Sequence, residues 1–234
     1  MKKKKRVSTG IKKLDALIDG GYIKNSVTLI TGGAGTGKTI FAIQFLVDGI
    51  TKHNEPGMYI TFEEKKEKLY NDMLKFGWDL KKFEKQGKLT YLQYTPEQVQ
   101  QEVIKRGGIL DAMIPETKIK RLVIDSITSF ALLYKDELKK REDALSLFDL
   151  INKWDVTAVL TAQVEAPADH TISATLEFEV DGIIKLYHIK KRGIRERAFE
   201  ILKMRGTKIP EKTMELAISN KEGIKINPKK LVIF

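Results

Sequence analysis

The 234-residue sequence contains no cysteine, which excludes disulfide bonds and thiolate metal sites. Its only histidines, His53, His170 and His188, lie far apart in the sequence and argue against a zinc centre. No apolar run approaches the roughly 20 residues that a membrane helix needs. The basic start MKKKKR is followed by VSTGIKKLD, not by the apolar segment of a signal peptide. We therefore expect a cytoplasmic protein without a membrane partner.

Internal repeats and Pro- or Ser-rich linkers are also missing from the sequence. A chain of this length is sufficient for one α/β domain with a single core. We therefore predict a single domain over residues 1–234, in which residues 1–6 form a flexible basic tail.

The whole chain has a formal net charge of +11, and its positive charge is concentrated in two segments. Residues 2–6 contribute +5, and residues 185–208 contribute a net +7 from nine Lys or Arg against two Glu. The rest of the chain therefore carries about −1. A local excess of this kind indicates an anionic partner, either nucleic acid or phosphate, although a solvated basic surface would have the same composition.

A glycine-rich stretch, TLITGGAGTGKT at residues 28–39, follows a β-branched run and precedes a helical apolar stripe. It matches G-x-x-x-x-G-K-[ST], the phosphate-binding loop. Glycines let successive backbone N–H groups turn inward, and the following helix adds its free N–H groups and positive dipole end. A glycine-rich turn that matches by chance is the alternative, but the flanking strand and helix favour a nucleotide site.

The residues of this loop predict specific phosphate contacts. Lys38 would reach the β- and γ-phosphates, and the Thr39 hydroxyl would bind Mg²⁺. No residue that reads a purine is evident, so the loop does not distinguish ATP from GTP. The N-K-x-D sequence at residues 152–155 precedes its strand instead of following it, so we interpret it as a chance match. The predicted nucleotide-binding residues are Gly32, Gly33, Ala34, Gly35, Thr36, Gly37, Lys38 and Thr39.

Predicted strands and helices alternate along most of the chain, which favours a mainly parallel sheet with helices on both faces. Near the C-terminus, two strands around residues 191–193 predict a basic β-hairpin. Strands are expected at residues 27–30, 58–64, 89–94, 121–127, 157–163 and 222–234, and helices at residues 39–50, 67–77 and around 145–154.

Two further helix starts carry capping signals. Ser8 or Thr9 is expected to cap a short helix that ends before Gly20. Thr95 and Gln98, with a proline between them, form the pattern of a capping box.

Carboxylates at the ends of two predicted strands are candidates for the chemistry. Asp125 closes the apolar strand RLVID and suits the Walker B role of holding Mg²⁺ beside Thr39. Glu63 and Glu64 end the strand after the loop's helix, and one of them would activate the attacking water. The alternative for Asp125 is an ordinary aspartate at a strand end. The alternative for Glu63 and Glu64 is that both start the next helix, where carboxylates favour the helix dipole.

The motifs STGIKKLDALIDGG, GGAGTGKT, FEE, VIDS, LTAQ, EVDGIIKL and ILKMRGT together resemble the KaiC-like branch of the RecA superfamily of ATPases. They run from about residue 7 to residue 226, nearly the whole chain. The resemblance implies a RecA-like P-loop core, mainly a parallel sheet, with a C-terminal β-hairpin extension. It also implies ATP and Mg²⁺ as ligands.

The resemblance implies roles for further residues. It supports Glu63 and Glu64 as water-activating groups, and Gln163 would sense the γ-phosphate. Lys203 and Arg205 would project into the nucleotide site of a neighbouring subunit, so activity would require a homo-oligomeric ring, often of six subunits. The alternative for this last pair is charge on one face of a hairpin strand.

The sequence also departs from the resemblance. Clock members of the family carry two tandem copies of the domain, whereas this chain contains one. Some relatives have a histidine after R-G-T, where this sequence has Lys208 and Ile209. No phosphorylated Ser/Thr pair can be placed, so autokinase activity is not expected.

Three functions are compatible with this sequence. The first is a Mg²⁺-dependent ATPase that forms a homo-oligomeric ring and switches an unidentified protein partner. The second is a recombinase-like nucleic-acid binder, which would use the local positive charge and the connections at residues 132–143 and 165–179. The third is a non-hydrolysing nucleotide sensor or scaffold.

Overall fold

The computed structural model describes residues 5–95, 98, 114, 116–131, 134, 136–163, 177–191 and 193–233. Residues 1–4 of the predicted tail and most of the connection at residues 165–179 lie outside these ranges.

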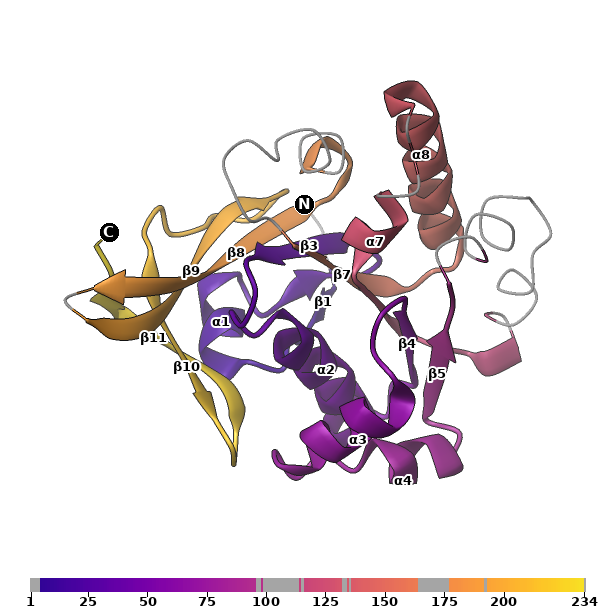
Figure 1. Cartoon of the computed structure of the whole chain (residues 1–234), viewed down its shortest axis with the longest axis horizontal. Coiled ribbons are helices and arrows are strands. Elements are labelled where there is room, and N and C mark those ends of the chain that lie inside the picture. The colour runs from indigo at the N-terminus through magenta and orange to yellow at the C-terminus, as the bar shows by residue number, and fades with distance from the viewer. Residues whose placement is uncertain are drawn as a thin grey trace.

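A nine-stranded sheet with the order β11-β10-β9-β8-β3-β7-β6-β4-β5 forms the centre of the molecule (Figure 1). Its neighbours from β8 to β5 are all parallel, which confirms the predicted mainly parallel α/β fold. These strands are β3 (Val27–Gly32), β4 (Gly57–Thr61), β5 (Leu89–Gln93), β6 (Arg121–Asp125), β7 (Thr157–Gln163) and β8 (Gly182–Lys191).

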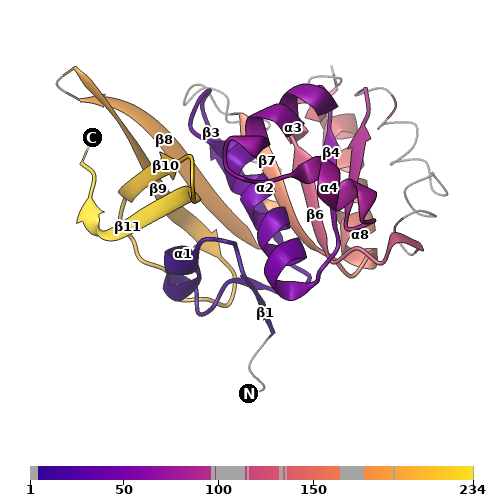
Figure 2. The same cartoon turned by 90° about the horizontal axis from the view of Figure 1, so that it is seen from below.

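An antiparallel extension continues the sheet beyond β8, as the predicted hairpin required (Figure 2). It consists of β9 (Ile194–Met204), β10 (Met214–Ser219) and β11 (Gly223–Leu231). The sequence analysis did not assign β10. Its Met214 and Leu216 are both buried in the core and are two residues apart, which is the period of a strand.

Helices cover both faces of the sheet, as expected. Figure 1 shows α2, α3 and α4 on one side and α7 and α8 on the other. The core strands separate two apolar clusters: Tyr59, Val123 and Val159 face α2, whereas Met58, Leu122 and Leu160 face α8. Strands buried on both faces read as continuous apolar runs, which is why they could be predicted. The helices are α1 (Lys12–Leu17), α2 (Lys38–Asp48), α3 (Lys66–Leu74), α4 (Leu80–Lys85), α7 (Ile127–Ala131) and α8 (Glu137–Lys153), and a π-helical turn, η1 (Gly49–His53), continues α2.

The first of the predicted helix caps is wrong and the second is confirmed. Ile11 occupies the N-cap of α1 without a side-chain hydrogen bond, and the hydroxyls of Ser8 and Thr9 donate to Asp15 instead. Near β5, the Thr95 N–H donates to Gln98 Oε1 at 2.8 Å, and the Gln98 N–H donates to Thr95 Oγ1 at 3.3 Å. These two bonds are the predicted capping box.

The boundary of the predicted flexible tail also needs correction. Arg6 belongs to strand β1 (Arg6–Val7), which pairs with β2 (Tyr22–Ile23). Its guanidinium donates to the carbonyl of Gly21 at 3.2 Å and to Thr207 Oγ1 at 2.8 Å. Arg6 is therefore part of the folded domain.

Candidate functional site

The glycine-rich loop connects the end of β3 to the first residue of α2, as the motif requires. Gly37 is the N-cap of α2 with a φ of 104°, and a Cβ there would lie 2.9 Å from Ile218 Cδ1. A Cβ on Gly32 would lie 2.5 Å from the carbonyl oxygen of Leu186 on β8. Gly32 therefore has no room for a side chain and the positive φ of Gly37 favours glycine, so the loop packs tightly between β8 and β10.

Lys38, the first residue of α2, curls back over this loop. Its Nζ donates to the carbonyl oxygens of Gly32 at 2.8 Å and Gly33 at 2.9 Å. The Thr36 hydroxyl donates to the same Gly33 carbonyl at 3.0 Å. The ammonium group therefore lies within the loop itself, where a phosphate oxygen could replace either carbonyl.

Asp125 lies beside Thr39 at the carboxyl end of the sheet. The Thr39 hydroxyl donates to Asp125 Oδ2 at 2.7 Å. Tyr59 donates to the same oxygen at 2.8 Å, and Thr161 donates to Oδ1 at 2.5 Å. Three hydroxyls from three different elements therefore fix the orientation of one buried carboxylate.

The sequence analysis missed Tyr59 and Thr161. Each is a polar side chain between two apolar neighbours of its strand, and this pattern is the signal that could have identified them. Burial, together with the charge of Asp125, raises the pKa of Tyr59 well above its ordinary value. The phenol therefore remains a hydrogen-bond donor to Asp125 even at alkaline pH.

The Thr39 hydroxyl and the Asp125 carboxylate supply the oxygen ligands that Mg²⁺ prefers. Among the described residues, no group of three or more His, Cys, Asp or Glu could hold a metal ion. Magnesium commonly takes one or two protein oxygens and completes its shell with water and substrate phosphates. The pair therefore fits a magnesium ion carried by a nucleotide.

The two glutamates after β4 point in different directions. Glu63 Oε1 accepts hydrogen bonds from the hydroxyls of Ser126, at 3.4 Å, and Ser129. Glu64 Oε2 lies 3.5 Å from Lys68 Nζ, on α3. The N-cap of α3 is Lys65, without a side-chain hydrogen bond, so neither glutamate caps that helix. Glu63 is the one that lies beside the strand end of Asp125.

Gln163 is the last residue of β7 and pairs in the sheet with Gly32, the first residue of the loop motif. Its backbone N–H donates to Thr128 Oγ1 on α7 at 2.7 Å. The sheet therefore places Gln163 directly beside the loop, at the carboxyl edge where Asp125 also lies.

Lys203 and Arg205 do not reach the loop of their own chain. Lys203 pairs through Ile183 with Leu29, three residues before Gly32. At a rise of about 3.3 Å per residue, Lys203 is displaced from Gly32 by about 10 Å toward the amino-terminal end of β3. It also lies two strands away from β3 across the sheet.

Both side chains instead contact the segment before β8. Lys203 Nζ donates to the carbonyl oxygens of Glu177 at 2.8 Å and Phe178 at 3.2 Å. Arg205 donates to the same Phe178 carbonyl at 2.8 Å and lies 3.6 Å from Asp181 Oδ1. Partial burial, with the charge of Arg205, lowers the pKa of Lys203. The pair forms one cationic group near the amino-terminal end of β3, away from Gly32 at its other end.

Two other hairpin residues lie beside the loop and were not singled out from the sequence. Arg197 Nε donates to the carbonyl oxygen of Gly35 at 3.3 Å. Its cross-strand partner, His188, lies near the same residue, because a Cβ on Gly35 would be 3.8 Å from His188 Nδ1. Burial lowers the pKa of His188, and the charges of Arg197 and Arg195 lower it further. No pattern in the sequence indicates that this part of the hairpin folds against the loop.

Known proteins resemble this chain over nearly its whole length. A family model described as "ATPase: KaiC" matches residues 7–231. The circadian clock protein KaiC3 of Synechocystis sp. is 34% identical over 231 residues, which are 95% of this chain and 46% of that protein. The chain thus spans about half the length of its clock-protein relatives. Within the described residues, no helix could span a membrane.

Two archaeal proteins match at full length. The UPF0273 protein MJ1359 of Methanocaldococcus jannaschii is 32% identical over 97% of this chain and 98% of its own. The crystal structure of the KaiC-like protein PH0186 of Pyrococcus horikoshii superposes with a TM-score of 0.84 at 35% identity, and the match covers 97% of this chain and 100% of that one. The loop, the strand order and these matches agree: the chain belongs to the KaiC family of P-loop ATPases.

Proposed function

We propose that this protein hydrolyses ATP with Mg²⁺ as its cofactor. The observation that carries the proposal is the 2.7 Å contact between the Thr39 hydroxyl and the Asp125 carboxylate, at the residue that follows Lys38 in the loop motif. The loop amides and Lys38 would hold the phosphates, and Thr39 and Asp125 would hold the metal beside them. Bound Mg²⁺ would neutralise charge on the phosphates. A cytoplasmic location is part of this proposal.

Glu63 is the proposed water-activating residue. Its carboxylate is held by two serine hydroxyls at the strand end of Asp125, and it would accept a proton from water that attacks the γ-phosphate. Glu64 is the weaker candidate, because its carboxylate pairs with Lys68 on α3. Gln163, beside Gly32 in the sheet, would sense the γ-phosphate.

The active form in this proposal is a homo-oligomeric ring, a hexamer, in which Lys203 and Arg205 act on the neighbouring subunit's nucleotide. Support comes from the position of the two residues. Both lie away from the phosphate-binding loop of their own chain, and Arg205 is exposed to solvent. A transition-state arginine of this kind accelerates phosphoryl transfer by about 10³–10⁵. Hydrolysis would then switch an unidentified protein partner.

Replacing Glu63 with glutamine tests the proposed reaction. The variant Glu63→Gln should bind ATP normally, whereas its turnover should fall by about 10²–10⁴, because amides do not accept the proton. Glu64→Gln is the matched control and should retain most of its activity. Equal turnover in Glu63→Gln and wild type would remove Glu63 from the mechanism. Phosphate release at background in the wild type, despite tight ATP binding, would favour a non-hydrolysing sensor.

Nucleic-acid binding is a second candidate, favoured by the exposed side chains of Lys190, Lys191 and Arg195 at the tip of the β8–β9 hairpin. Binding through phosphates makes log affinity fall steeply with log salt concentration. A filter-binding titration across salt concentrations therefore tests it, and no retention of DNA or RNA at low salt would exclude this function.

A further inference from the structure

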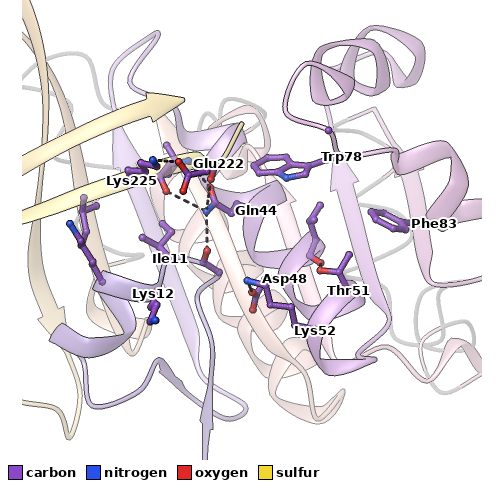
Figure 3. A pocket seen from close by; sticks show the side chains of 16 residues that line it. Ile11, Lys12, Gln44, Asp48, Thr51, Lys52, Trp78, Phe83, Glu222 and Lys225 are labelled. Carbon is purple, nitrogen blue, oxygen red and sulfur yellow. Dashed lines mark hydrogen bonds and ion pairs between the residues drawn. The ribbon is translucent and has the colours of Figure 1, made fainter. Parts of the chain in front are cut away.

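A cavity lies along α2, away from the phosphate-binding loop (Figure 3). Its volume is about 630 Å³, within the range of small-molecule pockets. The helix residues that line it begin at Gln44, six residues after Lys38 and thus about 9 Å along the axis. None of the loop residues lines it, so the cavity is separate from the nucleotide site proposed above.

One side of this cavity is aromatic. Trp78 and Phe83 line it from the α3–α4 side, and Figure 3 shows the Trp78 indole reaching toward Gln44. Phe76 stacks against Trp78 at 5.1 Å between ring centroids and fixes the indole in place. Ile11 and Ile224 add aliphatic wall on the opposite side. A flat ring could therefore bind between rigid apolar surfaces without ordering new side chains.

Most polar groups on the floor of the cavity are already engaged, although Asp48 Oδ2 accepts no hydrogen bond within the described residues. The Gln44 amide donates to the Gly10 carbonyl at 2.9 Å and accepts from the Ile224 N–H at 2.7 Å. The Asp48 carboxylate lies 2.8 Å from Lys52 Nζ and 3.7 Å from the buried Arg121. Glu222 pairs with Lys225. The two acidic side chains are therefore neutralised by cations of the same chain.

Two cations of the rim lack such a partner. Lys12 and Lys13 line the cavity from α1, and neither makes an ion pair within the described residues. The lining side chains comprise four lysines and two carboxylates, a net charge of +2. The uncompensated charge favours an anion near Lys12 and Lys13, and the aromatic wall favours a ring opposite them.

We propose that this cavity binds a small aromatic anion of the size of a nucleoside monophosphate, with its ring against Trp78 and its anionic group near Lys12 and Lys13. The site is independent of ATP hydrolysis. Ile224 lines the cavity and also lies near the loop, since its Cδ1 would be 3.4 Å from a Cβ built on Gly37.

AMP is a suitable probe, and Trp78 can report its binding. The chain has two tryptophans, so Trp154→Phe leaves Trp78 alone. Lys38→Ala in the same chain removes the main phosphate ligand of the loop. We expect a saturable change in fluorescence with AMP at one site per chain, and weaker binding of adenosine and of inorganic phosphate. Since this variant lacks the loop lysine, the result is separate from whether the wild type hydrolyses ATP.

Charge reversal locates the site. Lys12→Glu and Lys13→Glu should each weaken AMP binding about fivefold, and added salt should weaken it further. Lys153→Glu, on α8 and the other face of the sheet, is the matched control and should leave the affinity within twofold. Calorimetry on the Lys38→Ala chain with both tryptophans gives the same comparison without the Trp154 change. A signal that does not saturate, equal affinities in all three lysine variants, or adenosine binding as tight as AMP would overturn the proposal.

Discussion

The Thr39 hydroxyl donates to Asp125 Oδ2 at 2.7 Å, across 86 residues of sequence. Thr39 lies in the helix that follows β3, whereas Asp125 is the last residue of β6, and the parallel sheet brings both strand ends to one edge. Tyr59 and Thr161 hold the carboxylate in place from two further elements. This contact is the basis of the proposed metal site.

The Thr39 hydroxyl can be removed without changing the shape of the side chain. Thr39→Val should raise the Mg²⁺ concentration needed for half-maximal ATP hydrolysis about tenfold, because a metal ligand is lost. Thr39→Ser keeps the hydroxyl and should remain close to wild type. A magnesium titration of phosphate release measures this difference, and identical titrations for both variants would contradict the role of Thr39.

Complementation between subunits tests the shared site. Arg205→Ala should reduce turnover by about 10³ or more while the loop still binds ATP. Lys38→Ala should be inactive for a different reason, since it lacks the phosphate ligand. Mixed rings contain intact loops next to intact Arg205 side chains, so mixing the two inactive variants should restore part of the activity. If the mixture is as inactive as its components, Arg205 does not act across subunits.

Arg197 is expected to support the loop within its own chain. Its contact with the Gly35 carbonyl places a positive charge next to the proposed phosphate site. Arg197→Ala should therefore weaken ATP binding about tenfold, because hydrogen bonds to charged groups contribute about 1.5–3 kcal/mol. Calorimetric titration with ATP and Mg²⁺ checks this, with Arg195→Ala at the exposed tip as the control. The account of Arg197 fails if both variants bind ATP alike.

Two buried tyrosines should respond in opposite ways to loss of the hydroxyl. Tyr22 OH has no hydrogen-bond partner among the described residues, so Tyr22→Phe should raise the free energy of unfolding by about 1 kcal/mol. Tyr59→Phe removes a donor to Asp125 and should lower it by about 1–2 kcal/mol. Urea denaturation at neutral pH measures both changes, and a loss of stability in both variants would contradict this assignment.

The same tyrosines predict an alkaline loss of stability. Burial raises the pKa of Tyr59 well above its ordinary value of 10.0, and it also raises that of Tyr22. Above pH 10 the unfolded chain releases these protons while the folded chain keeps them, so the free energy of unfolding falls as the pH rises. The melting temperature should therefore decline above pH 10, and less steeply in Tyr22→Phe. Equal slopes for Tyr22→Phe and wild type would argue against this origin.

Much of this arrangement could be predicted from the sequence, because the necessary signals are local. The loop motif, the apolar core strands and the hairpin turn each occupy a short continuous segment, and the KaiC family followed from their order. Asp125 and Glu63 could be placed near the loop because parallel strands end at one edge of the sheet.

Other features depend on contacts between distant segments. Tyr59 and Thr161 carry no motif, and their role follows only from the strand order that surrounds Asp125. Arg197 contacts Gly35 because β8 pairs with β3, a relationship that no periodicity reveals. The predicted cap at Ser8 or Thr9 was wrong because Asp15 accepts both hydroxyls, which leaves Ile11 to begin the helix.

Phosphate release from ATP, measured with and without Mg²⁺ for the wild type and Asp125→Asn, is the most direct test of the central claim. We expect the wild type to hydrolyse ATP only when Mg²⁺ is present, and Asp125→Asn to lose most of this activity at every Mg²⁺ concentration. Hydrolysis that continues unchanged without Mg²⁺, or in Asp125→Asn, would contradict the proposed site.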